Sequence, residues 1–138
     1  MSEKHSWADI KRLVYKRADG CCEYCQTCEH NTGQPMHIEH IIPGDNDELD
    51  NLCLACASCN LSKATATTEV DPNTQSTVSL FNPRTQMWTD HFEWIDNNCR
   101  IGGKTAIGRA TVVRLKMNQD RLVRARRNWI RSGNHPPK

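Results

Sequence analysis

Seven of the eight cysteines of this 138-residue chain lie between Cys21 and Cys59, and six of the seven stand in Cys-x-x-Cys pairs. Each such pair can form a knuckle that presents two thiolates to a tetrahedral Zn²⁺ ion. Two pairs complete the coordination and leave no open position, so this zinc would be structural. A core of this modest size benefits from such a staple, and we predict a single zinc-stapled domain over residues 1–138.

Four overlapping pairs leave the register of the zinc ligands open: 22/25, 25/28, 53/56 and 56/59. We favour Cys22, Cys25, Cys56 and Cys59, because Cys53 then alternates with its leucine neighbours along a strand. Thirty residues separate the two chosen pairs, which is longer than a usual zinc-ribbon gap and leaves room for an inserted hairpin. The surplus cysteines are then interpreted as small buried or incidental thiols. They are Cys21, Cys28, Cys53 and Cys99.

The first twenty residues contain no apolar segment of the kind that forms a signal peptide. No apolar run approaches the ~20 residues that a membrane span requires. We therefore expect a cytoplasmic protein that binds no membrane. In that compartment paired Cys-x-x-Cys motifs indicate metal ligands, and disulfides are the alternative interpretation.

The net charge of +2 conceals a division of the chain into an acidic and a basic part. Residues 1–108 carry nine Lys and Arg against fifteen Asp and Glu, a net charge of −6. Residues 109–131 carry eight Lys and Arg against one Asp, a net charge of +7. This asymmetry indicates a phosphate-binding element beside a cation-binding region.

Between the two favoured knuckles, residues 36–63 have the pattern of strand, loop, strand and helix. Apolar and polar residues alternate along 36–41, and Pro43-Gly44 ends that strand. A second strand is predicted at residues 51–54, and a helix is predicted to start at Asn60. The first strand therefore carries a carboxylate and a histidine side by side, and the helix start carries an amide.

This stretch resembles the HNH nuclease motif, whose core is the ββα-metal fold. The matching residues are Glu39-His40-Ile-Ile-Pro43, then Asn51-Leu52, then Cys56-x-x-Cys59-Asn60-x-x-Lys63. The resemblance covers roughly residues 11–66, and it places zinc knuckles where Cys22, Cys25, Cys56 and Cys59 stand. It implies an α+β fold with a small ββα-metal core stapled by a structural Zn²⁺.

The resemblance also implies roles for single residues. His40 would be the general base, since histidine has an unperturbed pKa near neutrality. Glu39 and Asn60 would ligate the catalytic cation, and Asn51 would brace the loop that holds His40. Lys63 would contact a phosphate near the site.

Two departures from the common pattern affect the cation. Asn60 stands where many relatives have histidine, and Glu39 stands where aspartate is common. Oxygen ligands favour Mg²⁺ or Mn²⁺ over softer metals. His37 shares a strand face with Glu39 and is a further candidate ligand. The acidic residues of the loop at 45–50 are interpreted as a solvated surface.

The flanking segments are predicted to extend this core. Ser6 is expected to cap an amphipathic N-terminal helix that ends near Asp19-Gly20. Residues 67–108 are predicted to form a polar surface loop at 67–78 and a hairpin that joins 90–95 with 99–107.

Residues 109–131 are predicted to form one long basic helix with an apolar stripe. A row of like charges on another face of that helix is not neutralised within it. We therefore expect its arginines to contact a nucleic-acid backbone. The expected contacts are Arg114, Arg121, Arg124 and Arg131.

The sequence thus predicts a metal-dependent HNH endonuclease that hydrolyses phosphodiester bonds of DNA, expected to be double-stranded. A homodimer is left open, because two copies meeting across a duplex would cut both strands. The alternative is a zinc-stapled nucleic-acid-binding module without catalytic activity.

Overall fold

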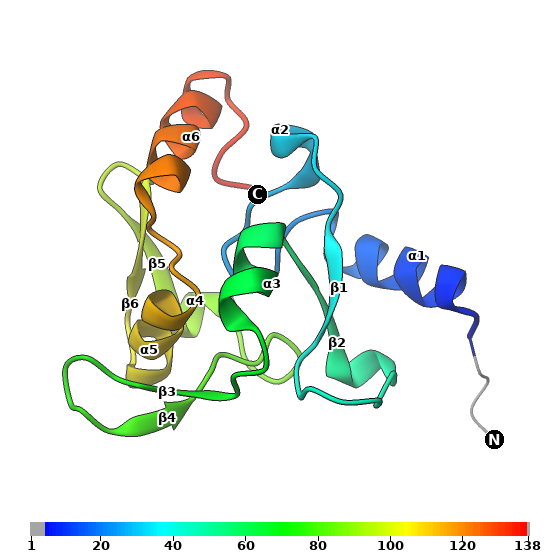
Figure 1. The fold of residues 1–138 in the computed structure, drawn as a ribbon. Coiled ribbons are helices and arrows are strands. Elements are labelled where there is room, and N and C mark those ends of the chain that lie inside the picture. Colours follow the sequence, from blue (N-terminus) through cyan, green and yellow to red (C-terminus); the bar gives the residue numbers. More distant parts are fainter. Residues whose placement is uncertain (1–4, 138) are drawn as a thin grey trace.

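The computed structural model describes residues 5–137 as an α+β fold of short helices and three two-stranded antiparallel sheets (Figure 1). The helices are α1 (Trp7–Arg17), α2 (Glu29–Thr32), α3 (Ala57–Lys63), α4 (Trp88–His91), α5 (Ala106–Arg114) and α6 (Asp120–Arg131), with a 3₁₀ helix at Leu49–Asn51. The sheets pair β1 (His37–His40) with β2 (Leu52–Ala55), β3 (Thr68–Val70) with β4 (Thr77–Ser79), and β5 (Phe92–Ile95) with β6 (Arg100–Gly103). The α+β class expected from the sequence is confirmed.

The N-terminal helix begins as predicted. The Ser6 hydroxyl accepts a hydrogen bond from the Asp9 N–H at 3.1 Å and so caps α1. Ile10 and Val14 are buried on its inner face. Tyr15 adds a link to the next element, because its hydroxyl accepts the Met36 N–H at 2.8 Å just before β1. The helix therefore fixes where the first strand of the core starts.

The ββα unit is formed by β1, β2 and α3. Strand β1 pairs with β2 from His37 opposite Ala55 to His40 opposite Leu52. All four residues of β2 are buried. Helix α3 starts three residues earlier than predicted, because Cys56 caps it by accepting the Cys59 N–H on its sulfur at 3.4 Å. The second Cys-x-x-Cys pair thus forms the first turn of the helix.

Residues 67–78 form the β3–β4 hairpin instead of the surface loop that their composition predicted. The turn is organised by Asp71, whose buried carboxylate accepts hydrogen bonds from Thr74 and from the guanidinium of Arg109. Arg109 Nε lies 2.9 Å from Asp71 Oδ1, and Arg109 Nη2 lies 2.9 Å from Asp71 Oδ2. This bidentate ion pair connects the hairpin to α5. The polar side chains of this segment therefore do not form a solvated loop. They take part in a local network of hydrogen bonds that includes the Asp71–Arg109 ion pair.

The predicted basic helix 109–131 is divided into α5 and α6. Leu115 and Met117 are fully buried in the intervening segment, and Lys116 adopts a φ of 51°. The Asn118 side chain pairs with β6, accepting the Ile101 N–H and donating to the Ile101 carbonyl, both at 2.8 Å. These contacts with the core and the sheet break the helix at a point where the apolar spacing alone would have continued it.

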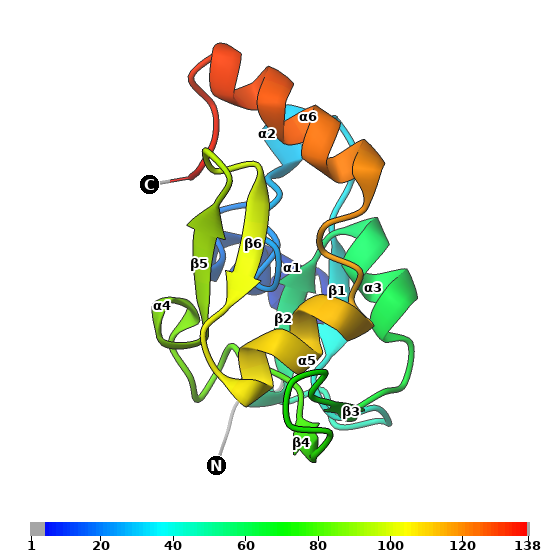
Figure 2. The ribbon, with the colours of Figure 1, turned by 90° about the vertical axis from the view of Figure 1, so that its left-hand side faces the viewer.

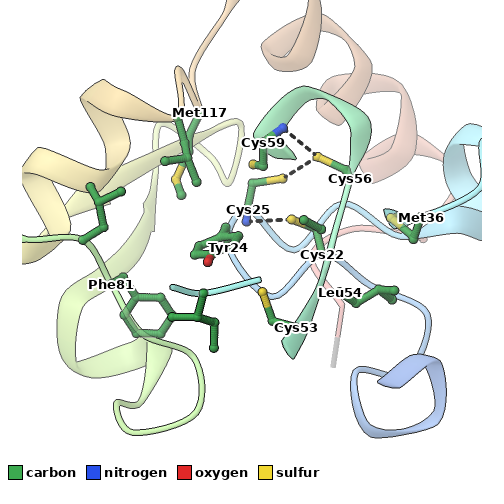
Figure 3. Packing of buried hydrophobic residues seen from close by; sticks show 14 of the residues in the cluster. Cys22, Tyr24, Cys25, Met36, Cys53, Leu54, Cys56, Cys59, Phe81 and Met117 are labelled. Carbon is green, nitrogen blue, oxygen red and sulfur yellow. Dashed lines mark hydrogen bonds between the residues drawn. The ribbon is translucent and has the colours of Figure 1, made fainter. Parts of the chain in front are cut away.

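The predicted hairpin joins β5 to β6 with Phe92 opposite Gly103 and Ile95 opposite Arg100. Phe92 is buried against Phe81, with ring centroids 5.1 Å apart, while Trp88 and Trp94 pack partly buried against the same core. That cluster is continuous with the residues around the four zinc-knuckle cysteines (Figure 3). None of the helices described over residues 5–137 is long and apolar enough to cross a membrane.

Candidate active site and metal centre

The fold brings together the four cysteines that the sequence analysis favoured. The Sγ atoms of Cys22, Cys25, Cys56 and Cys59 all lie within 4.8 Å of one another, and all four residues are buried. The sulfurs of Cys25 and Cys56 are 3.6 Å apart (Figure 3). A tetrahedral Zn²⁺ with Zn–S bonds of about 2.3 Å spaces its sulfurs about 3.8 Å apart. The donor set therefore fits a closed, structural zinc site.

The thiols of this centre share their protons. Hydrogen bonds from Cys22, Cys56 and Cys59 hold the pKa of the Cys25 thiol well below its ordinary value, whereas burial raises the pKa of Cys22 and the hydrogen bonds to its neighbours raise the pKa of Cys59. Arg126 of α6 is fully buried nearby and donates to the backbone carbonyls of Cys99 at 3.0 Å and Met117 at 2.6 Å. Burial lowers the Arg126 pKa, and attraction to the cysteine sulfurs opposes that shift. A zinc ion bound by four thiolates would leave two negative charges, which this guanidinium would partly balance.

Two of the surplus cysteines are not free thiols. Cys21 and Cys28 form a disulfide across the first knuckle, which corrects the expectation of incidental thiols at these positions. Cys28 is therefore not free to ligate zinc with Cys25, so the alternative register 25/28 has no support in the fold. Cys53 and Cys99 are buried thiols, as expected, and burial raises the pKa of Cys53 to about 12.

Glu39 and His40 lie at the end of β1 and point to opposite sides of it. Glu39 is only 8% exposed and faces α3, whereas His40 is half-buried at the surface. Burial raises the pKa of the Glu39 carboxyl, and the Lys63 ammonium lowers it, followed by the nearby imidazoles. The Glu39 carboxylate thus lies in an environment where a cation is needed to keep it charged.

Lys63 supplies one such cation from the last turn of α3. Its ammonium lies 3.5 Å from the Glu39 carboxylate and donates to the carbonyls of His40 at 3.3 Å and Ile41 at 3.2 Å. The residue is 1% exposed. It therefore faces the interior, and this placement contradicts the expected contact with a substrate phosphate. Lys63 instead holds α3 against the end of β1.

Asn60 lies three residues before Lys63 on α3, so the two side chains are neighbours on one face of the helix. From that face the Lys63 ammonium reaches Glu39, whereas no side-chain contact of Asn60 is among those described for residues 5–137. A carboxylate and an amide oxygen are the hard ligands that a divalent cation such as Mg²⁺ prefers, and the role of Glu39 and Asn60 as its ligands stays a prediction. His37 is exposed at the start of β1, and its role as a ligand stays a prediction.

Asn51 braces the loop that follows β1. Its buried side-chain amide accepts the Ile42 N–H at 2.9 Å and donates to the carbonyls of Ile42 at 3.1 Å and Asn46 at 2.9 Å. The loop therefore has a fixed path immediately after His40. A role for Asn51 in catalysis stays a prediction.

One contact at the site was missed by the sequence analysis. The Asp47 carboxylate lies 2.7 Å from Nε2 of His40, although the acidic loop was interpreted as solvated surface. The only signal in the sequence was that an acidic residue follows the histidine within a short loop, and this pattern alone does not place a side chain.

The four arginines expected to bind nucleic acid are divided between two helices. Arg121, Arg124 and Arg131 are exposed on α6, whereas Arg114 is half-exposed on α5 with Glu69 3.8 Å away. The two views place α6 at the opposite end of the molecule from β3 and β4 (Figure 1; Figure 2).

Helix α3 connects the arginine-bearing end to the His40 end. The Gln119 side chain, just before α6, donates to the Ser58 hydroxyl at 3.0 Å near the start of α3. Lys63 contacts the end of β1 from the other end of the same helix. Seven residues at ~1.5 Å each make α3 about 10 Å long.

Comparison with known proteins agrees with this geometry. The family model for HNH endonucleases matches residues 22–65, the segment that contains both zinc knuckles, β1, β2 and α3. The chain is 29% identical to the Septu protein PtuB of Bacillus thuringiensis over an alignment of 120 residues, and the match covers 83% of this chain. The chain spans 43% of that relative's length. No solved structure matches.

Proposed function

We propose, on the basis of the HNH endonuclease domain at residues 22–65, that this protein is a metal-dependent endonuclease acting on DNA. HNH nucleases act on nucleic acid and use a divalent metal. One observation carries the proposal: a surface histidine lies at the end of β1, next to a buried carboxylate that faces an amide-bearing helix. His40, Glu39 and Asn60 are all chemically competent residues for hydrolysis.

In the proposed reaction His40 takes a proton from a water molecule. The hydroxide oxygen bonds to phosphorus while the bond from phosphorus to the 3′ oxygen breaks. The 3′ oxygen takes a proton from solvent, so the products carry a 5′-phosphate and a 3′-hydroxyl. Glu39 and Asn60 would hold the divalent cation, with His37 as a further candidate, and the bound cation would supply charge neutralisation at the phosphate. Mg²⁺ or Mn²⁺ suits these oxygen ligands.

The exposed arginines of α6 are proposed to contact the DNA backbone, with double-stranded DNA as the substrate. Arg121 and Arg124 project from the first half of that helix, which begins next to α3. Replacing one such arginine with alanine should weaken binding similarly for all sequences and reduce the salt slope by about one. Two copies meeting across a duplex would cut both strands, and a homodimer is proposed for that reaction.

A second candidate function is a nucleic-acid-binding module held together by zinc. The buried cysteine cluster and the basic helix make up a large share of the domain. Both would serve a protein that binds nucleic acid without cutting it, and this favours the second function. The two candidates differ in one measurable property, the turnover of a phosphodiester bond.

The test compares the wild-type protein with His40→Ala on supercoiled plasmid, with Mg²⁺, with Mn²⁺ and with EDTA. Zinc content is measured on the same preparations. We expect the wild type to cut, EDTA to stop it, and His40→Ala to lose cleavage while still binding one zinc ion. If the wild type binds DNA but cuts with neither metal, the binding-module function replaces the nuclease. If His40→Ala cuts as fast as the wild type, the assignment of the base is wrong.

A further inference from the structure

The loop between β1 and the 3₁₀ helix places one carboxylate directly on the proposed base. Asp47 Oδ1 lies 2.7 Å from His40 Nε2, the distance of a short charge-assisted hydrogen bond. The side chains are 26% exposed for His40 and 56% exposed for Asp47. The pair therefore lies at the surface where solvent reaches both side chains, and no hydrogen bond to the other ring nitrogen of His40 is among those described for residues 5–137.

The backbone on both sides of Asp47 is anchored. The carbonyl of Asn46 accepts a hydrogen bond from the buried Asn51 amide at 2.9 Å, and the Asn46 side chain accepts the Glu48 N–H at 3.0 Å. The same Asn51 amide clamps Ile42, two residues after His40. One buried side chain thus fixes the histidine's end of the loop and the aspartate's end relative to each other.

We propose that Asp47 is the positioning residue of His40, an inference that rests on the nuclease function proposed above. Its carboxylate accepts the Nε2–H of the imidazole and so selects the tautomer in which Nδ1 carries the lone pair. Nδ1 is then the atom that takes the proton from water. The same carboxylate stabilises the imidazolium formed by that transfer, in the way an orienting aspartate supports a histidine base. Asn51 acts on His40 through this loop.

The neighbouring carboxylates provide a matched control. Asp45 is an exposed residue of the same loop, and its side chain makes no hydrogen bond or ion pair among the contacts described for residues 5–137. Asp45→Ala removes the same charge from the same loop without removing the contact to His40. A general effect of loop charge on DNA binding would appear in both variants, whereas positioning would appear only in Asp47→Ala.

The kinetic arm measures cleavage by the zinc-loaded full chain with Mg²⁺. We expect Asp47→Ala to lower kcat roughly tenfold or more with KM unchanged, as loss of an orienting partner does. Asp47→Asn should keep part of the rate, because its amide oxygen still accepts the Nε2–H. Asp45→Ala should cut at the wild-type rate. Equal kcat for the wild type and Asp47→Ala would overturn the proposal.

The spectroscopic arm does not depend on cleavage. Ring-nitrogen chemical shifts of His40 are measured in ¹⁵N-labelled protein at about pH 8.5, where free imidazole is neutral, and are assigned with His40→Ala. We expect the Nε2–H tautomer in the wild type and in Asp45→Ala, and a mixture in Asp47→Ala. If Asp47→Ala has the same His40 tautomer as the wild type, the positioning role proposed for Asp47 is wrong. A wild type that has the expected tautomer but does not cut counts against the nuclease function alone.

Discussion

At the scale of single residues, the least expected placement is that of Lys63. An ammonium group that is 1% exposed is stabilised only if acceptors surround it, and here two carbonyls and the Glu39 carboxylate do so. Lys63 in turn acts on Glu39, because its ammonium opposes the rise in the Glu39 pKa that burial causes. The charge of the proposed metal ligand is thus coupled to the packing of α3.

This coupling predicts the effect of Lys63→Met, which keeps much of the side-chain volume and removes the charge. We expect a loss of about 2–3 kcal/mol in the free energy of unfolding, because Glu39 would remain buried without its partner. This expected loss lies at or below the lower end of the range for breaking a buried ion pair, because the 3.5 Å distance between Lys63 Nζ and Glu39 Oε1 is long. Denaturant unfolding of the zinc-loaded protein at pH 7 measures it.

The double variant Glu39→Gln with Lys63→Met is the control for that measurement. It removes both charges, so it should recover part of the stability that Lys63→Met loses. If the single variant is as stable as the wild type, Lys63 does not neutralise Glu39.

The motif predicted the order of the elements that carry Glu39, His40, Asn51 and Asn60, but not where the side chains of these elements point. The order Glu39, His40, Asn51 and Asn60 could be read from the sequence because spacing fixes their elements. The inward direction of Lys63 and the reach of Asp47 depend on how α3 packs on β1 and how Asn51 folds the loop. Those are tertiary contacts, and no local pattern encodes them.

At the scale of elements, tertiary contacts also explain where residues 67–131 differ from the predicted elements. Apolar spacing from Val112 to Leu122 is compatible with a single helix. The chain breaks there because Met117 enters the core and Asn118 pairs with the backbone of Ile101 on β6. The hairpin β5–β6 was predictable from alternation and turn residues, since these signals are local. The hairpin β3–β4 was not, because its turn depends on Arg109 of α5.

The Asp71–Arg109 pair yields a prediction about pH. Hydrogen bonds from Arg109 hold the pKa of the Asp71 carboxyl below its ordinary value. A depressed folded-state pKa contributes stability that is fully present above the unfolded pKa of about 3.9 and is lost as the pH falls further. We therefore expect Asp71→Asn to lower the thermal midpoint by a constant amount between about pH 5 and 7. The difference from the wild type should shrink below about pH 4.

Thermal unfolding followed by circular dichroism across this pH range measures the effect. Glu93→Gln is the matched control, because it neutralises an exposed carboxylate on β5 that has no ion-pair partner among those described for residues 5–137. A difference between Asp71→Asn and the wild type that grows on acidification would contradict the assigned role.

At the scale of the whole molecule, the four-cysteine cluster joins parts of the chain that share little other structure. Cys22 and Cys25 follow α1, Cys56 and Cys59 open α3, and Arg126 brings α6 to the same place. The hydrophobic cluster surrounds these sulfurs and extends to Phe81 and Ile101 (Figure 3). Without a bound metal, four buried thiols would stand at the point where the core, the ββα unit and α6 meet.

We therefore expect Cys59→Ser to lose zinc and to lack a cooperative thermal transition, since a structural zinc contributes on the order of 10 kcal/mol to folding. Cys99→Ser is the matched control. Cys99 is also buried but lies outside the cluster, so this variant should keep one zinc per chain and a cooperative transition. Elemental analysis and calorimetry on both variants provide the two readouts. A Cys59→Ser protein that folds cooperatively without metal would mean that apolar packing alone holds the ββα unit to the basic helix. In that case zinc would have no structural role in this fold.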